Sequence, residues 1–161
     1  MCSITPPEET YDRFTRLVSH ILDVPVALIS LVDDERQFFT SQVGLGEPWA
    51  TMRQTPLSHS FCQFTVTFRQ PVVINDSTQH PLVARNLAVS ELGVAAYAGV
   101  PLITSSGEAI GSLCAIDGKP REWSDDEVAA LTDLGAILME LLELRGSARA
   151  KDPKARRPEV A

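Results

Sequence analysis

The chain has 161 residues, 44% of them hydrophobic and 22% charged, and a formal net charge of −7. These values are typical of one globular domain and argue against a disordered protein. The acidic balance argues against a nucleic-acid-binding function. The final segment, residues 146–161, differs from the rest because it holds five Lys or Arg against two Asp or Glu. We predict a single domain over residues 1–145 and a flexible basic tail over residues 146–161.

The N-terminal sequence and the cysteine content indicate a cytoplasmic protein. "MCSITPPEET" lacks the basic stretch and the apolar core of a signal peptide. No apolar run reaches the ~20 residues that span a bilayer. Three widely spaced cysteines, Cys2, Cys62 and Cys114, are typical of reduced thiols in a chain without a secretion signal. We therefore expect a protein of the cytoplasm that is not inserted in a membrane.

The first three elements are expected to be a helix and a β-hairpin. Thr5 is a suitable N-cap with Glu8 three residues later, and apolar residues then recur at helical spacing, which predicts a helix over 6–22. "VPVALISLV" (24–32) is a β-branched apolar run, typical of a strand covered on both faces. After the polar turn "DDER", residues 37–44 are expected to return as the antiparallel partner.

The middle of the chain is less regular. Residues 46–56 contain glycine, tryptophan and two prolines, which predict a loop. Ser58 is a candidate N-cap for a helix through "HSFCQFTVTFRQ". We then expect a short strand over 71–74 and a helix over 82–92 that stops at Gly93.

The last three elements are expected to be a second hairpin and a long helix. "AAYAGVPLIT" (95–104) and "AIGSLCAID" (109–117) are apolar strands joined by a turn of serine and glycine. Ser124 and Glu127 form a capping box for a helix that reaches about Arg145. Two hairpins separated by helices predict an α/β sandwich of the α+β type, with a mostly antiparallel sheet.

The final helix carries apolar residues over a wide arc. Four keep heptad spacing, and four lie outside that stripe: Leu131, Leu134, Leu138 and Leu141, then Val128, Ile137, Met139 and Leu142. A helix that is apolar beyond one face needs a second partner. We expect a homodimer through residues 6–22 and 124–145. The alternative is one wide core-facing stripe covered by the first helix.

His59 stands three residues before Cys62, and several functions are open for this pair. On a helix the two side chains would be neighbours, as a nucleophile and its base must be. Cys62, however, lies between Phe61 and Phe64, and free cysteine is among the most buried residue types. We therefore expect a packed or pocket-lining thiol, with a redox-sensing role as the second alternative.

The sequence gives little indication of a metal site or a nucleotide-binding site. Zinc sites use about four ligands with close pairing, whereas His59, Cys62, His80 and Cys114 contain one close pair. Haem needs a single ligand, so His59 or His80 leaves it open. Glycine-rich phosphate-binding motifs do not occur. We predict neither catalytic residues nor a metal site, and we regard an enzyme as the weaker alternative.

Several segments resemble the successive blocks of a GAF domain. They are "ALISLVDDERQFFTSQVGL", "LSHSFCQFTV", "PVVINDSTQHPLVARN", "AYAGVPLIT", "GEAIGSLCAID" and "WSDDEVAALTDLGAIL". They occur in the family's order over about residues 8–145. The resemblance is closest to the GAF domains found beside bacterial sensor kinases and diguanylate cyclases.

The resemblance implies a central antiparallel sheet with the terminal helices on one face and a ligand pocket under helices and loops on the other. The pocket roof would be residues 61–64 and 81–92. The candidate ligand-binding residues are Phe61, Cys62, Phe64, His80, Asn86, Tyr97 and Cys114. GAF pockets take cyclic nucleotides, haem, bilins, iron or metabolites, so the resemblance leaves the ligand and any cofactor unknown.

Departures from the family's patterns narrow the alternatives. The pigment-binding block of bilin-type members does not occur, and the asparagine that precedes the lysine in cyclic-nucleotide members is missing before Lys119. Cys62 matches one redox cysteine of the free methionine-R-sulfoxide reductases. Their catalytic cysteine falls in the segment matching "HPLVARN" (80–86), which has none. That absence argues against a reductase.

The sequence thus predicts a small-molecule-sensing or regulatory GAF module of bacterial signal transduction that acts through a helix-mediated homodimer. Its expected partners are an unknown small ligand, a second copy and a signalling protein, and not a nucleic acid or a membrane. A redox or haem sensor is the first alternative. An enzyme similar to the free methionine-R-sulfoxide reductases is the second.

Overall fold

The computed structural model describes residues 7–151 and contains one six-stranded sheet. Its two hairpins follow the first helix, α1 (Pro7–Leu22), and consist of β1 (Val26–Val32) with β2 (Arg36–Val43) and β5 (Ala96–Ile103) with β6 (Ala109–Asp117). Two short strands, β3 (Gln54–Pro56) and β4 (Val72–Ile74), form the edges and give the order β3-β2-β1-β6-β5-β4. All neighbouring strands are antiparallel. This confirms the predicted architecture.

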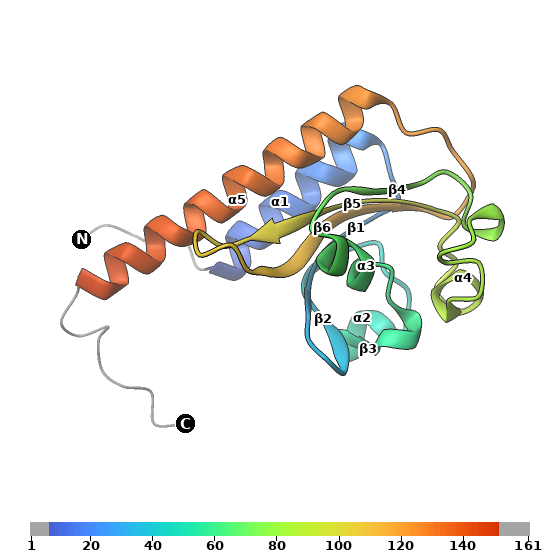
Figure 1. Cartoon of the computed structure of the whole chain (residues 1–161), viewed down its shortest axis with the longest axis horizontal. Helices are drawn as coiled ribbons and strands as arrows, with labels where there is room; N and C mark the ends of the chain where they lie inside the picture. The colour runs from blue at the N-terminus through green and yellow to red at the C-terminus, as the bar shows by residue number, and fades with distance from the viewer. Residues whose placement is uncertain (1–6, 152–161) are drawn as a thin grey trace.

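The remaining elements are helical. Short ones lie between the strands and a long one ends the described chain: α2 (Trp49–Met52), the 3₁₀ helix η1 (Leu57–His59), α3 (Cys62–Phe68), η2 (Ser77–Gln79), α4 (Leu87–Glu91) and α5 (Asp125–Lys151). Figure 1 shows α1 and α5 side by side on one face of the sheet, with α2, α3 and α4 beneath the other. We call α2, η1, α3 and α4 the roof. Within the described residues, no helix is both long and apolar enough to cross a bilayer.

The roof and the strand beside it depart from the sequence prediction in three places. The expected loop over 46–56 contains α2 and the edge strand β3, which is too short to show a hydrophobic pattern. The helix expected from Ser58 is interrupted: after η1 the backbone of Ser60 is extended, and α3 starts only at Cys62. The Ser60 hydroxyl accepts the backbone N–H of Gln63 at 3.1 Å.

The helix expected over 82–92 is shorter in the structure. Only Leu87–Glu91 is helical, because Asn86 acts as the N-cap and its side chain accepts the N–H of Ala88 at 2.9 Å. A capping residue marks the first turn of a helix, so the preceding residues form turns instead.

The final helix begins as predicted and ends later. Ser124 and Glu127 exchange hydrogen bonds of 3.1 and 2.9 Å between side chain and backbone, which is a reciprocal capping box. The helix continues to Lys151, so the start of the segment predicted as a flexible tail is helical. The rest of that segment, 152–161, and the predicted cap Thr5 lie outside the described residues.

Alternation along the strands divides the interior into two cores. On the helix side, Ala27 and Ile29 of β1 pack with Val18 of α1 and Leu138 of α5. On the roof side, the intervening Leu28 packs with buried residues of β5, β6 and the roof. The sheet therefore separates the terminal helices from the roof, and β1, β5 and β6 contribute to both cores.

Arg121 joins the terminal helices at one end. Its guanidinium donates to the carboxylate of Glu127 at 2.6 Å and to the backbone oxygen of Leu22 at 3.1 Å. It also reaches the carboxylate of Asp117 at 3.4 Å and lies 4.4 Å from the ring centre of Trp123. The end of α1, the end of β6 and the first turn of α5 are thus held by one side chain.

Candidate functional site

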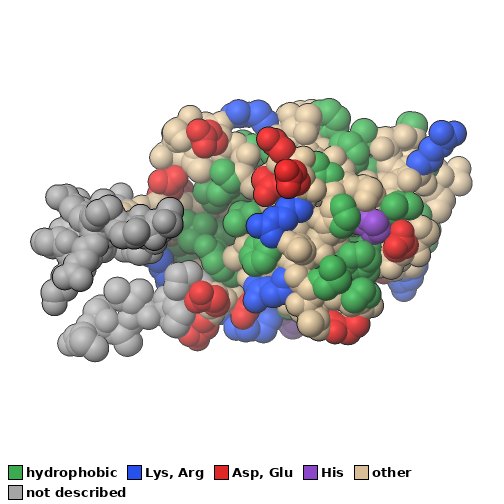
Figure 2. Space-filling view, turned by 90° about the horizontal axis from the view of Figure 1, so that it is seen from below, with side chains coloured by type: hydrophobic (Ala, Val, Ile, Leu, Met, Phe, Trp, Pro, Cys, Tyr) green, Lys and Arg blue, Asp and Glu red, His purple; other side chains and the backbone are tan. Residues whose placement is uncertain are grey.

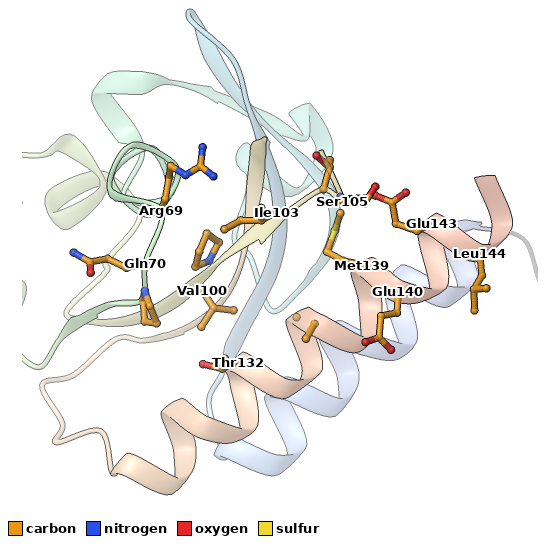
Figure 3. A pocket seen from close by; sticks show the side chains of 15 residues that line it. Arg69, Gln70, Val100, Ile103, Ser105, Thr132, Met139, Glu140, Glu143 and Leu144 are labelled. Carbon is orange, nitrogen blue, oxygen red and sulfur yellow. Dashed lines mark hydrogen bonds between the residues drawn. The ribbon is translucent and has the colours of Figure 1, made fainter. Parts of the chain in front are cut away.

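A wide groove lies on the helix side of the described structure, between α5 and the edge of β5. The short strand β4 pairs only with residues 97–99 of β5, so that edge is uncovered from Val100 onward. A groove of about 830 Å³ follows the uncovered edge (Figure 3). Val100, Ile103 and Met139 line it, and Glu140 and Glu143 of α5 stand opposite Arg69. The groove adjoins α5 and is separated by the sheet from the side where the sequence predicts a pocket.

The candidate site lies beneath the roof, between α3 and the sheet. Three residues predicted from the sequence, Phe61, Cys62 and Tyr97, line a cavity there together with His59 and Gln37. The remaining wall is apolar and is formed by Leu28, Ala88, Leu92, Val94 and Ile116. The cavity measures about 10 Å³, which is room for one water molecule. A larger ligand can enter only if the roof moves away from the sheet.

Four of the predicted residues do not line this cavity: Phe64, His80, Asn86 and Cys114. Phe64 and His80 lie in the segments around it. Both are half-buried. The ring of Phe64 stacks on Phe68 with the ring centres 6.4 Å apart. The Nδ1 atom of His80 accepts the backbone N–H of Leu82 at 3.3 Å. These side chains therefore stabilise the roof segments that surround the cavity.

A hydrogen-bond network fixes the roof to the sheet. Gln37 of β2 donates to the backbone oxygen of His59 at 3.2 Å and to the hydroxyl of Thr55 at 2.8 Å, and it accepts the hydroxyl of Ser60 at 2.8 Å. Asn86 donates to the backbone oxygen of Ser60 at 3.0 Å. Sequence reasoning missed Gln37, although period-two alternation places it on the same strand face as the buried Phe39.

The outer surface of the roof mixes side chains of every class. Figure 2 looks onto this side of the molecule and shows apolar, basic and acidic side chains interleaved across it. The large apolar side chains exposed on the roof helices are Met52, Phe68 and Leu87. They come from different short helices, so they do not form one stripe along a helix.

His59 and Cys62 face different partners. The Nδ1 atom of His59 lies 2.9 Å from the hydroxyl of Ser58. Its Nε2 atom lies 3.1 Å from the carboxylate of Glu91, within ion-pair distance but outside hydrogen-bond geometry. The sulfur of Cys62 instead faces Cys114. The structure therefore does not pair the thiol with the imidazole as a nucleophile with its base.

Cys62, Cys114 and Tyr97 form a fully buried cluster between α3 and the sheet. The two sulfur atoms are 3.8 Å apart, and the hydroxyl of Tyr97 donates to Cys62 Sγ at 3.3 Å. The same hydroxyl lies 3.0 Å from Thr65 Oγ1 and 3.3 Å from Ser112 Oγ. Sequence reasoning missed Ser112 and Thr65; Ser112 shares the roof-facing side of β6 with Cys114 by alternation.

The pKa values of the three groups in this cluster are shifted in different directions. The hydrogen bond from the Cys114 thiol is the largest influence on the pKa of Cys62, and with the Tyr97 hydroxyl it lowers that pKa to about 7 although burial opposes the shift. Burial raises the pKa of Cys114 well above its usual value, and it raises that of Tyr97 likewise. Cys62 is therefore the group that loses its proton first.

Comparison with known protein families identifies the family of this chain. The family model of the GAF domain matches residues 6–141. The chain belongs to the GAF family. This GAF domain is 33% identical over 134 residues to the cyclic di-GMP phosphodiesterase PA2567 of Pseudomonas aeruginosa, and the match covers 82% of the chain and 22% of that protein. The chain thus spans about a fifth of the length of this curated relative.

Solved structures agree with the family. The GAF domain has a TM-score of 0.70 and 19% identity to a domain of a putative two-component sensor histidine kinase from Sinorhizobium meliloti, covering 90% of this chain and 97% of that one. It has a TM-score of 0.71 and 19% identity to a free methionine-R-sulfoxide reductase from Neisseria meningitidis, covering 91% and 83%. At these identities the likeness shows the fold alone. The GAF domain is thus of a kind found in bacterial signalling proteins.

Proposed function

We propose that this GAF domain is a regulatory module of bacterial signal transduction that senses a small molecule and responds through a homodimer of its terminal helices. A matching segment in a longer cyclic di-GMP phosphodiesterase supports the signalling part. The observation that carries the proposal is an exposed apolar face on α1 and α5.

We call this surface the helix face; it consists of Leu17, Ile21, Leu134, Ile137, Leu141 and Leu144. Four of its side chains are strongly exposed, with Leu17 at 44%, Ile21 at 50%, Ile137 at 48% and Leu144 at 68%. The members on α5 alternate three and four residues apart, which is the spacing of a helix–helix seam. An apolar face of this kind on two neighbouring helices fits a second copy related by a two-fold axis.

The helix face differs from the stripe that the sequence suggested. Leu131 and Leu138 belonged to the expected heptad, but both are fully buried in the core of their own chain. Ile137 and Leu144 are exposed instead. The wide apolar arc of α5 thus has two parts, one that packs on the sheet and one that supports the proposed dimer.

Strand β5 connects the candidate site with α5. Tyr97 faces the roof, whereas Val100 faces the helices. A Cβ atom added to Gly135 of α5 would lie 3.1 Å from Val100, so the helix backbone packs directly on this strand. A ligand that moves the roof and β5 would therefore shift α5, provided that it binds one arrangement more tightly than the other.

The cavity wall indicates the class of ligand. Known ligand pockets measure roughly 300–1,000 Å³, so binding here requires the roof to open. The wall is mostly apolar, and His59, Gln37 and Tyr97 supply its polar groups. We propose a small, largely apolar ligand with one or two hydrogen-bonding groups.

Sedimentation velocity tests the dimer. We expect the purified protein to sediment as a dimer and the double variant Ile137→Glu, Leu144→Glu to sediment as a monomer, because both side chains would place charges in the seam. Met52→Glu is the matched control, since Met52 is 52% exposed on the roof and should leave the dimer intact. A monomeric parent protein, or a double variant that stays dimeric, would contradict the interface.

Native mass spectrometry of the protein purified from cells tests the ligand. We expect a small bound mass that is lost on unfolding. A dimer without any bound mass would contradict the sensing of a tightly held ligand while leaving the helix-mediated dimer in place.

The haem alternative has its own readout. The Nδ1 atom of His80 accepts the N–H of Leu82, which places the ring proton on Nε2. Haem bound through Nε2 would therefore require this contact to break and the proton to move to Nδ1. A Soret band that disappears in His80→Ala would establish this alternative. Failure of the protein to take up added haemin would remove it.

A further inference from the structure

Two thiols separated by 52 residues in sequence meet under the roof. Cys62 opens α3 and Cys114 lies in the middle of β6, with 3.8 Å between their sulfur atoms. A disulfide bond is about 2.05 Å long, so the sulfurs must approach by about 1.8 Å to form one. We propose that Cys62 and Cys114 are a redox pair that a small hydroperoxide converts into an intramolecular disulfide. This goes beyond the proposed sensing of a reversibly bound ligand and is independent of the dimer.

The surroundings of the pair prepare one sulfur for attack. The Tyr97 hydroxyl donates a hydrogen bond to Cys62 Sγ, and the sulfur of Cys114 lies 3.8 Å from the same atom. Once Cys62 has lost its proton, the Cys114 thiol is its second donor, so negative charge on Cys62 is stabilised by two donors. Cys114 retains its proton because burial and the neighbouring Cys62 raise its pKa, and the hydrogen bonds from Leu28 and Tyr97 do not offset them. The arrangement therefore assigns Cys62 as the nucleophile and Cys114 as the resolving thiol.

The reaction proceeds in two balanced steps. The Cys62 thiolate attacks the terminal oxygen of the hydroperoxide: the S–O bond forms, the O–O bond breaks, and the alcohol leaves with the proton released by Cys62. Cys114 then attacks the sulfur of the resulting sulfenic acid, and the hydroxyl leaves as water with the Cys114 proton. Two thiols are oxidised by two electrons in total, and one hydroperoxide is reduced to an alcohol and water.

Access to the pair depends on the roof. Both sulfurs are buried, and the cavity next to Cys62 has room for about one water molecule. The roof is built from helices of three to seven residues, which open locally more easily than long elements do. Hydrogen peroxide is little larger than water, so we expect it to react much faster than a bulky aromatic hydroperoxide.

The position of Cys114 distinguishes this pair from the reductase alternative. The segment 80–86, where the reductases carry their catalytic cysteine, holds no cysteine in this chain. The partner lies on β6 instead, beneath α3. The pair therefore acts as a stoichiometric sensor of oxidant, without a requirement for a sulfoxide substrate.

Peptide mapping tests the proposal directly. The protein in a Cys2→Ser background is treated with hydrogen peroxide, denatured in acid, alkylated and digested with trypsin. We expect a reducible link between peptides 54–69 and 86–121, which carry Cys62 and Cys114. In Cys114→Ala, dimedone should label Cys62 as a trapped sulfenic acid, whereas in Cys62→Ala the labelling of Cys114 should be far weaker.

The variant Tyr97→Phe tests whether the hydrogen bond to Cys62, and not only the closeness of the two sulfur atoms, promotes oxidation. It removes the hydroxyl donor and keeps the ring. If the pKa of Cys62 rises by about one unit from its value near 7, the thiolate fraction at pH 7, and with it the oxidation rate, falls about fivefold. Circular dichroism of each variant confirms that it is folded.

Three outcomes would overturn the redox pair. The first is that both thiols remain fully alkylated after peroxide treatment of the Cys2→Ser protein. The second is that the linked peptide forms only in urea, because the fold would then not bring the sulfurs together. The third is equal dimedone labelling of the two single variants. Sedimentation velocity of the same samples measures the dimer independently of the thiols. Failure of the redox pair can therefore be told apart from failure of the proposed dimer.

Discussion

On β5, the phenol ring of Tyr97 lies over Gly99, two residues further along the same face of the strand. A Cβ atom added to Gly99 would lie 2.2 Å from the Tyr97 hydroxyl oxygen and 2.5 Å from the ring carbon that carries it. Because glycine has no Cβ atom, residue 99 leaves free the space that the Tyr97 hydroxyl occupies. Through that hydroxyl, it also fixes one of the two hydrogen bonds to Cys62.

Gly99→Ala tests this dependence. The added methyl group would displace a fully buried ring, and overpacking of this kind lowers the free energy of unfolding by about 1–3 kcal/mol. Urea unfolding measures the change. Gly46→Ala is the matched control, since an added Cβ there meets nothing within 4 Å. Equal stability of both variants would show that the ring adapts without cost.

Arg121→Lys is expected to loosen the junction of the terminal helices. Lysine keeps the charge but lacks the planar fork that reaches the Glu127 carboxylate and the Leu22 oxygen together. Hydrogen bonds to charged groups contribute about 1.5–3 kcal/mol, so we expect a loss of that size in the free energy of unfolding. Thermal unfolding measures it. Arg85→Lys, at an exposed residue, is the control and should unfold like the parent protein.

The cysteine cluster predicts a pH dependence of stability under reducing conditions. Folding lowers the pKa of Cys62 from 9.0 to about 7, so between these values the unfolded chain binds more protons than the folded one. The free energy of unfolding therefore rises with pH across this window, by up to about 1.4 kcal/mol per pH unit. Urea titrations at a series of pH values measure the slope.

The sign reverses at higher pH. The pKa of Cys114 is raised in the folded protein, so above 9.0 the unfolded chain is the first to lose this proton, and stability falls. Tyr97 adds to the fall above its usual value of 10.0. We expect the difference in stability between the parent protein and Cys62→Ala to rise from pH 7 to 9.0, whereas the fall above 9.0 should appear in both proteins, because both contain Cys114 and Tyr97. A difference that is flat from pH 7 to 9.0 would show that Cys62 stays protonated.

The strands were predictable because their sequence pattern is strong. β1, β2, β5 and β6 are long runs of apolar or alternating residues bounded by turn residues, and their hairpin pairing follows from the short connections. The roof was harder. β3 and α2 have three and four residues, too few to show any period, and Asn86 rather than Leu82 begins α4.

The cysteine contact could not be derived from the sequence by local reasoning. Cys62 and Cys114 come from different elements, and their proximity depends on how α3 lies across β6. Alternation does place Cys114 on the roof-facing side of its strand. The distance to Cys62, however, depends on long-range packing and on the network around Gln37 that seats the turn before α3.

The Arg121 junction has a mechanical consequence for α5. The helix has 27 residues and is therefore about 40 Å long, and Arg121 grips it at its first turn only. A tilt of about 5° around this grip would carry the opposite end through roughly 3–4 Å. Leu131 and Leu138 are buried against the sheet, so such a tilt would have to move together with the strands beneath the helix, and the part of α5 beyond Leu138 would be displaced most.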